Sequence, residues 1–246
     1  MRQHLPNMIT LLNVFCGCAA VIFAVRDQME LTAFFVFLGI FFDYFDGLLA
    51  RLLKVQSELG IQLDSLADMI TSGLVPGIVM FQLIDMSQAG SWTPDGETTG
   101  FNLAGILPFF GFLITLASAF RLARFNTDEN QVSSFRGLPT PANALLIISL
   151  PLILLYQGND YLNAFILNPW FLFILTLLSC FLLNAPITLF ALKFKDWSFK
   201  ENALRYLFVI VSVVLLLTLR FLAIPAIIAI YILSSLFAPK AQPGAG

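Results

Sequence analysis

The chain has 246 residues, of which 59% are hydrophobic and only 11% are charged. A soluble domain carries about 25% charged residues, so this chain has too little polar surface to cover a water-soluble globule of its size. The formal net charge is −2 and no run of Lys or Arg occurs, so we expect no nucleic-acid partner. The composition therefore predicts an all-α, polytopic membrane protein.

Apolar windows long enough to cross a bilayer core of about 30 Å recur along the chain. Eight are predicted, at residues 6–25, 31–51, 61–84, 102–121, 140–156, 169–192, 204–219 and 221–237. Only Arg220 separates the last two windows, and the first lacks the small-residue cleavage site of a signal peptide. We therefore expect residues 1–237 to form a single transmembrane helical bundle, and residues 238–246 to be a disordered tail.

The distribution of basic residues predicts the orientation of these spans. With eight spans, both termini lie on the same side of the membrane. That side and its helix ends carry eleven of the 13 Lys and Arg residues, and the other side has only Arg26 and Arg220. By the positive-inside rule the first side is cytoplasmic. We expect a multi-pass protein of the cell (inner) membrane with cytoplasmic N- and C-termini.

Four carboxylates lie in the hairpin formed by the second and third predicted spans, residues 41–73. Asp43 and Asp46 are three residues apart, and Asp64 and Asp68 are four apart, so each pair shares one face of its helix. The turn between the helices is short enough to bring the two faces together. An Asp at the centre of a membrane helix costs about 2.5–3.5 kcal/mol. Such residues persist where a cavity, a counter-charge or a bound ion offsets that cost.

Divalent cations would relieve the repulsion among these carboxylates. Clustered oxygen ligands without Cys or His favour Mg²⁺ or Mn²⁺ over zinc. Gly47 and Gly60 flank the carboxylates, and the absence of side chains there lets a bulky ligand approach the backbone. The hairpin therefore predicts a metal site beside a ligand pocket.

Together these residues resemble the signature of the CDP-alcohol phosphatidyltransferase family. The matching positions are Asp43, Asp46, Gly47, Ala50 and Arg51 on the first helix, and Gly60, Asp64 and Asp68 on the second. Every gap between them has the length found in the family. The resemblance implies an enzyme in which a hydroxyl acceptor displaces CMP from a CDP-linked lipid.

The resemblance also implies a role for each position. Asp43, Asp46 and Asp64 would hold two divalent cations, Mg²⁺ or Mn²⁺, against the diphosphate. Asp68 would be the general base and would touch a metal as well. The site for the CDP-lipid would comprise Asp43, Asp46, Gly47, Ala50, Arg51, Gly60 and Asp64. The active site would face the cytoplasm, where the nucleotide is soluble.

Three further segments resemble the membrane-integral phosphatidylserine synthases of this family: LPNMITLLNVFCG (5–17), ASAFRLARFN (117–126) and FRGLPTPAN (135–143). This resemblance implies CDP-diacylglycerol and L-serine as substrates and a homodimer among membrane lipids. The candidate serine-binding residues are Arg121, Arg124, Asn126, Arg136, Thr140 and Asn143. Arg121 or Arg124 could hold the serine carboxylate bidentately. Alternatively, these arginines only satisfy the positive-inside rule or bind lipid phosphates.

Other functions remain open on the sequence alone. Within the family the acceptor could be glycerol 3-phosphate or an inositol phosphate, although a dianionic acceptor would favour more basic residues at the pocket. The lipid tails could be acyl or ether chains. From a different class, the four aspartates could form the cation site of a transporter. That function predicts paired broken helices in two related halves, which the sequence lacks, and it leaves Arg51 and the glycines unexplained.

Overall fold

The computed structural model describes residues 4–89, 103–127, 137–187 and 199–237, and these are helical without any strand. Within these ranges, five helices are long and apolar enough to cross a membrane, or six when one bent pair is counted as a span. The prediction of an all-α, polytopic membrane bundle is therefore confirmed. The count of eight spans and the side on which the termini lie stay predictions, and the tail at 238–246 falls outside the described residues.

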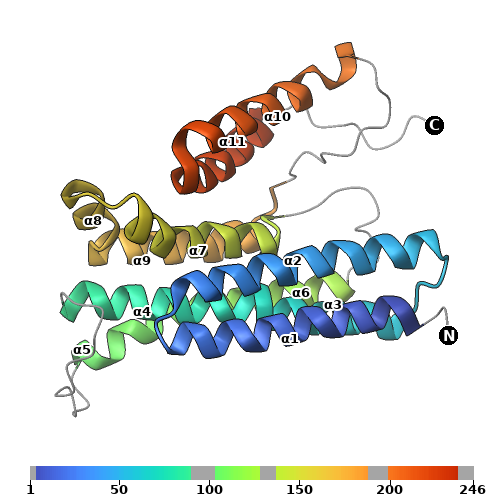
Figure 1. Ribbon diagram of the computed structural model, residues 1–246, viewed down its shortest axis with the longest axis horizontal. Coiled ribbons are helices and arrows are strands. Elements are labelled where there is room, and N and C mark those ends of the chain that lie inside the picture. The colour runs from blue at the N-terminus through green and yellow to red at the C-terminus, as the bar shows by residue number, and fades with distance from the viewer. Residues whose placement is uncertain (1–3, 90–102, 128–136, 188–198, 238–246) are drawn as a thin grey trace.

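The first two helices, α1 (Leu5–Val25) and α2 (Met29–Leu52), form an antiparallel pair that packs along most of its length (Figure 1). Pro6 lies in the first turn of α1, where its missing N–H costs no hydrogen bond. Between the helices, Asp27 takes a positive φ of 58° and accepts a hydrogen bond from Gln82 at 2.9 Å. This tight turn fixes the register of α2 against α1.

A long helix runs through the middle of the bundle and changes type along its length. It begins as α3 (Glu58–Asp68), continues as the π-helical turn η2 (Met69–Leu74) and ends as α4 (Val75–Ala89). The Ser57 side chain caps its start by accepting a hydrogen bond from the Gly60 N–H at 3.1 Å. The predicted third span at 61–84 lies within this helix, but the sequence analysis did not foresee the π turn.

The next segment comprises α5 (Leu103–Ile106), the 3₁₀ turn η3 (Leu107–Phe112) and α6 (Leu113–Thr127). At Gly111 an added Cβ would lie 2.5 Å from the Phe81 backbone nitrogen, so glycine permits η3 to pack directly against α4. Because α6 runs beside η2, its last turns come close to the aspartate-bearing part of the bundle.

Three helices then complete the main bundle: α7 (Thr140–Tyr156), α8 (Asp160–Ile166) and α9 (Pro169–Asn184), with a 55° bend between the last two. Gly137 and Leu138 precede α7 and donate backbone hydrogen bonds to Ile187 and Leu182, at 2.9 and 2.8 Å. These bonds hold the start of α7 beside the end of α9.

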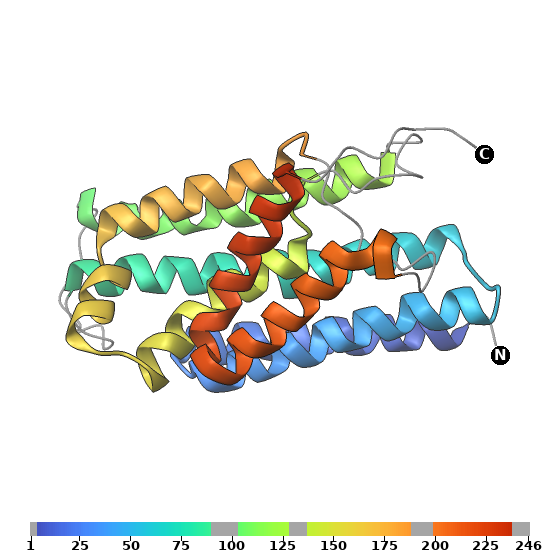
Figure 2. The same ribbon diagram turned by 90° about the horizontal axis from the view of Figure 1, so that it is seen from above.

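The last two helices, α10 (Phe199–Leu219) and α11 (Ala223–Phe237), meet at the short 3₁₀ turn η4 (Arg220–Leu222). The chain turns back there, where Arg220 has a φ of +50°, and the helices form a V (Figure 2). The Gln157 side chain, at the end of α7, donates to the Leu219 carbonyl and accepts from the Leu222 N–H. This pair lies across α7 and α9 from α1 (Figure 1), apart from the aspartate hairpin.

Candidate active site

The aspartates of the hairpin converge where α2 and α3 face each other. One carboxylate oxygen from each of Asp43, Asp46 and Asp64 lies within 4.8 Å of the others. Asp46 is only 5% exposed, and its Oδ2 atom has no hydrogen-bond partner among the described residues. Farther along α2, Ala50 is half-buried and Arg51 is exposed. Two helices thus bring three acidic groups to one point.

This donor set fits a hard divalent cation. Carboxylates this close repel one another strongly in a medium of low dielectric constant, and a buried unpartnered carboxylate oxygen is costly unless something binds it. Mg²⁺ and Mn²⁺ take oxygen ligands of this kind. Asp43, Asp46 and Asp64 thus form an acidic cluster of the kind that the sequence predicted for a metal site. The role of each aspartate as a ligand stays a prediction.

The two glycines of the motif have different surroundings. Among the described residues, an added Cβ at Gly47 would have only Arg51 Nη2 as a neighbour within 4 Å, at 3.8 Å, so none of them fills the space beside it. An added Cβ at Gly60 would lie 3.2 Å from Ser57 Oγ and 3.3 Å from Asn7 Oδ1. Gly60 therefore permits the close contact between α1 and α3, whereas Gly47 leaves room for a ligand beside the carboxylates.

Asp68 has different neighbours from the other three aspartates. Thr140 Oγ1 donates a hydrogen bond to Asp68 Oδ2 at 3.3 Å, and Arg121 Nη1 donates to Thr140 Oγ1 at 3.5 Å. We call this chain of side chains the Asp68 relay. It joins α3, α6 and α7, which are far apart in the sequence, and it places a cation behind the Asp68 carboxylate. A carboxylate held in this way is suited to accepting a proton from a nearby hydroxyl.

Three buried polar residues, which we call the buried layer, follow or precede members of the relay by one helical turn. Ser72, Ser118 and Asn143 are each 0% exposed, and neither serine Oγ nor either polar atom of the Asn143 side chain has a partner among the described residues. Each lies one helical turn from a member of the relay. A buried polar group left unpaired costs about 1–3 kcal/mol, so this layer favours a polar ligand. The sequence analysis found Asn143 but missed the two serines, whose one-turn spacing was the available signal.

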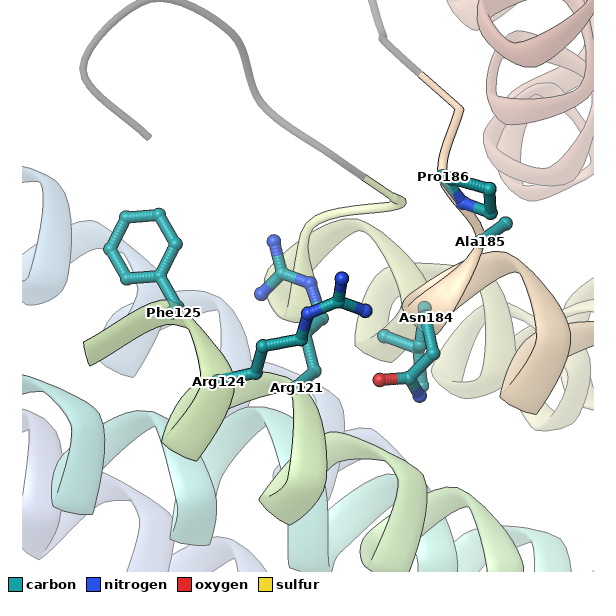
Figure 3. Close-up of a pocket in the computed structure, with 7 residues that line it drawn as sticks. Arg121, Arg124, Phe125, Asn184, Ala185 and Pro186 are labelled. Atoms are coloured by element: carbon teal, nitrogen blue, oxygen red, sulfur yellow. The ribbon is translucent and has the colours of Figure 1, made fainter. Parts of the chain in front are cut away.

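The two arginines of α6 border a small cavity of about 20 Å³, room for a single water (Figure 3). The lining residues are Arg121, Arg124, Phe125, Leu183, Asn184, Ala185 and Pro186. Figure 3 shows both guanidinium groups projecting from the same side of α6. Asn184 donates to the Ala117 carbonyl at 3.1 Å, and its Oδ1 atom has no partner in the described part of the chain. Asn184 was not among the predicted site residues.

One predicted acceptor-binding residue, Asn126, is not part of the relay. The Asn126 side chain donates to Ser65 Oγ at 2.9 Å and to Gln62 Oε1 at 3.4 Å, so it ties α6 to α3. Arg136 lies outside the described residues. Serine binding by either residue stays a prediction.

The chain is similar in sequence to one protein family and to several known enzymes. The model of one protein family, described as CDP-alcohol phosphatidyltransferase, matches residues 3–183. A CDP-diacylglycerol–serine O-phosphatidyltransferase of Bacillus subtilis (strain 168) is 29% identical over 166 residues, which are 66% of this chain and 81% of the relative.

Two other organisms have relatives with the same printed name. The protein of Helicobacter pylori (strain ATCC 700392 / 26695) is 31% identical over 145 residues, covering 58% of this chain and 55% of the relative. That of Saccharomyces cerevisiae (strain ATCC 204508 / S288c) is 31% identical over 163 residues, covering 60% and 53%. The match thus spans only about half the length of these two relatives.

Proposed function

This chain belongs to the CDP-alcohol phosphatidyltransferase family, and on that premise we propose that it transfers a phosphatidyl group from CDP-diacylglycerol to the hydroxyl of L-serine. The products are phosphatidylserine and CMP. The observation that carries the proposal is the convergence of Asp43, Asp46 and Asp64, with Asp68 one helical turn beyond Asp64 and hydrogen-bonded to Thr140. The names of the relatives supply the substrates.

The metal site would hold two divalent cations, Mg²⁺ or Mn²⁺, with Asp43, Asp46 and Asp64 as ligands and Asp68 at its edge. Bound cations would neutralise the diphosphate and stabilise the charge that develops on the leaving group. The open space beside Gly47 admits the diphosphate. Ala50, Arg51 and Gly60 complete the CDP-lipid site in this proposal.

The chain's own residues would position the acceptor and move its proton. Asp68 accepts the proton of the serine hydroxyl as the hydroxyl oxygen bonds to the phosphorus that carries diacylglycerol. The bond from that phosphorus to the CMP oxygen breaks, and CMP leaves with the electron pair. Thr140 keeps Asp68 Oδ2 oriented through its hydrogen bond. A positioned carboxylate base typically contributes about 10²–10⁴-fold to such a step.

Serine recognition would use the arginines and the buried layer. Serine carries a carboxylate, which needs donors, and an ammonium, which needs acceptors. Arg121 Nε has no partner among the described residues, and Arg124 projects beside it (Figure 3). Asn143 offers both an unpaired donor and an unpaired acceptor. This combination suits a zwitterionic amino acid better than a dianionic phosphate.

The proposed substrates indicate where the enzyme is located, and the resemblance to the family implies a homodimer. The family's lipid substrate is held in the bilayer while its nucleotide head is water-soluble, so the site should open toward the cytoplasm. The end of the bundle that carries the α2–α3 turn also carries the N-terminus (Figure 1). We place this end on the cytoplasmic side of the cell membrane and expect the chain to work as a homodimer.

The deciding experiment measures CMP release by the purified protein in detergent. CDP-diacylglycerol and Mg²⁺ or Mn²⁺ are supplied with L-serine, glycerol 3-phosphate or inositol phosphate in separate reactions. We expect CMP release only in the reaction that contains L-serine. The Asp68→Asn variant should release no CMP but should still bind the CDP-lipid. Release only with a phosphorylated acceptor would refute serine as the substrate. Metal-ion uptake into protein-containing vesicles, without CMP release from any acceptor, would instead indicate a transporter.

A further inference from the structure

A buried hydrogen bond joins α1 to the π turn that follows Asp68. Thr71 Oγ1 donates to Asn13 Oδ1 at 2.8 Å, and the Asn13 carbonyl oxygen lies 3.3 Å from the same hydroxyl. Both residues are 0% exposed. A buried side-chain bond of this kind fixes the position of η2 against α1, because breaking it leaves polar atoms unpaired in the core.

Two glycines make room for this contact. An added Cβ at Gly17, on α1, would lie 2.5 Å from Thr71 Oγ1. One at Gly39, on α2, would lie 2.7 Å from Thr71 Cγ2 and 2.8 Å from Asn13 Oδ1. Real Cβ atoms do not approach other heavy atoms so closely, so any larger residue would displace Thr71. The π turn is thus held from two helices at once.

The π turn sets the direction in which the aspartates of α3 point. A π turn contains about one residue more than an α turn, and each α-helical residue rotates the chain by about 100°. Conversion of η2 to an α turn would therefore rotate α3 by about 100° relative to α4. With side-chain atoms about 5 Å from the helix axis, this moves a carboxylate by about 8 Å. The ligand atoms of Asp43, Asp46 and Asp64 lie within 4.8 Å of one another, so the rotation would separate them.

The same face of α1 also reaches the other aspartate-bearing helix. Thr10, three residues before Asn13, is 3% exposed; its hydroxyl donates to the Pro6 carbonyl at 3.1 Å, and its side chain lies near the Asp46 carboxylate. One face of α1 therefore touches α2 at Asp46 and η2 at Thr71. In the described part of the chain, neither Asn13 nor Thr71 hydrogen-bonds to one of the four aspartates, so we treat both as lying outside the catalytic machinery itself.

We propose that Asn13 and Thr71 are positioning residues for the metal site: their hydrogen bond holds the π turn, and the π turn keeps Asp64 and Asp68 facing Asp43 and Asp46. The inference rests on the proposed function, because it takes the aspartates to be metal ligands. It assigns a role to a buried polar contact that the transfer reaction itself does not use.

The test is Mn²⁺ binding to the purified protein in detergent, measured by electron paramagnetic resonance of free Mn²⁺ without substrates. Thr71→Val keeps the shape of the side chain but removes the donor, and we expect Mn²⁺ affinity to fall at least about tenfold, as for other groups that orient metal ligands. Thr71→Ser keeps the hydroxyl and should retain wild-type affinity. The matched control is Thr176→Val: Thr176 is equally buried, but the one partner of its hydroxyl among the described residues is the Leu172 carbonyl of its own helix. Thr71→Val should also slow CMP release, and saturating Mn²⁺ should restore part of that rate.

Each outcome bears on a separate claim. Absence of Mn²⁺ binding in the wild type would overturn the metal site of the proposed function. Wild-type Mn²⁺ affinity in a folded Thr71→Val protein would overturn the positioning role while leaving the proposed function intact. If Thr71→Val does not fold, Gly17→Ala decides: the displaced Thr71 should weaken Mn²⁺ binding, and unchanged affinity in that variant would overturn the inference.

Discussion

Replacing Thr140 with Val separates the orientation of Asp68 from the binding of metal. Thr140 is 0% exposed, and its hydroxyl is the only link of the relay between Arg121 and Asp68 that the described residues provide. Val has nearly the same shape, so the substitution removes the hydroxyl without opening a large cavity. Asp43, Asp46 and Asp64 keep their positions on α2 and α3.

The size of the effect follows from the geometry of the relay. A hydrogen bond to a charged group contributes about 1.5–3 kcal/mol. The 3.3 Å separation of Thr140 Oγ1 and Asp68 Oδ2 exceeds the ordinary range for O–H···O bonds, so the lower value, about 1.5 kcal/mol, applies. Since about 1.4 kcal/mol corresponds to a factor of ten in rate, kcat should fall about tenfold.

The assay is serine-dependent CMP release at saturating substrates and Mn²⁺, with Mn²⁺ affinity measured in parallel. Thr140→Val should lower kcat and leave Mn²⁺ affinity unchanged, and Thr140→Ser should restore the rate. Thr32→Val is the control, because Thr32 is equally buried and its hydroxyl bonds, within the ranges that the structure describes, only to the Gln28 carbonyl at the start of its own helix. An unchanged kcat would refute the orienting role of Thr140, and a loss of Mn²⁺ affinity would show that it supports the metal site instead.

Three further predictions test other parts of the molecule. Asp43→Asn or Asp64→Asn should raise the Mn²⁺ concentration needed for half-maximal CMP release at least about tenfold; an unchanged requirement would remove that residue from the metal site. Arg124→Ala should raise the KM for serine about tenfold, through loss of a charge-assisted hydrogen bond, and leave the KM for CDP-diacylglycerol unchanged; a uniform effect on both would point to a general role in binding lipid phosphates. Burial and the nearby charge of Asp85 raise the pKa of Asp27 above its ordinary value of 3.8, so the ionised carboxyl destabilises the folded state at neutral pH. Asp27→Asn should therefore raise the Tm at pH 8, with a gain that shrinks as the pH falls toward 3.8; a Tm that falls at pH 8 would show that the hydrogen bond from Gln82 depends on the charge.

The sequence alone determined those features of this protein that depend on neighbours along one helix. The 3.6-residue period places Asp43 with Asp46, and Asp64 with Asp68, on single faces, and the short turn after α2 brings those faces together. The same spacing carries the resemblance to the family that the comparisons confirm. The helix break at Arg220 was also visible as the only charge between two apolar windows.

Only the tertiary structure decided which distant side chains meet. Asp68 and Thr140 are 72 residues apart, and their contact depends on how α3 and α7 pack, which no local pattern encodes. The polar side chain of Asn126 was predicted to bind the acceptor, but the packing of α6 against α3 pairs it with Ser65. The π turn likewise depends on a threonine that reaches Asn13 on another helix. Periodicity fixes the face on which a residue lies, whereas the rotation and separation of whole helices arise from close packing of side chains contributed by the entire bundle.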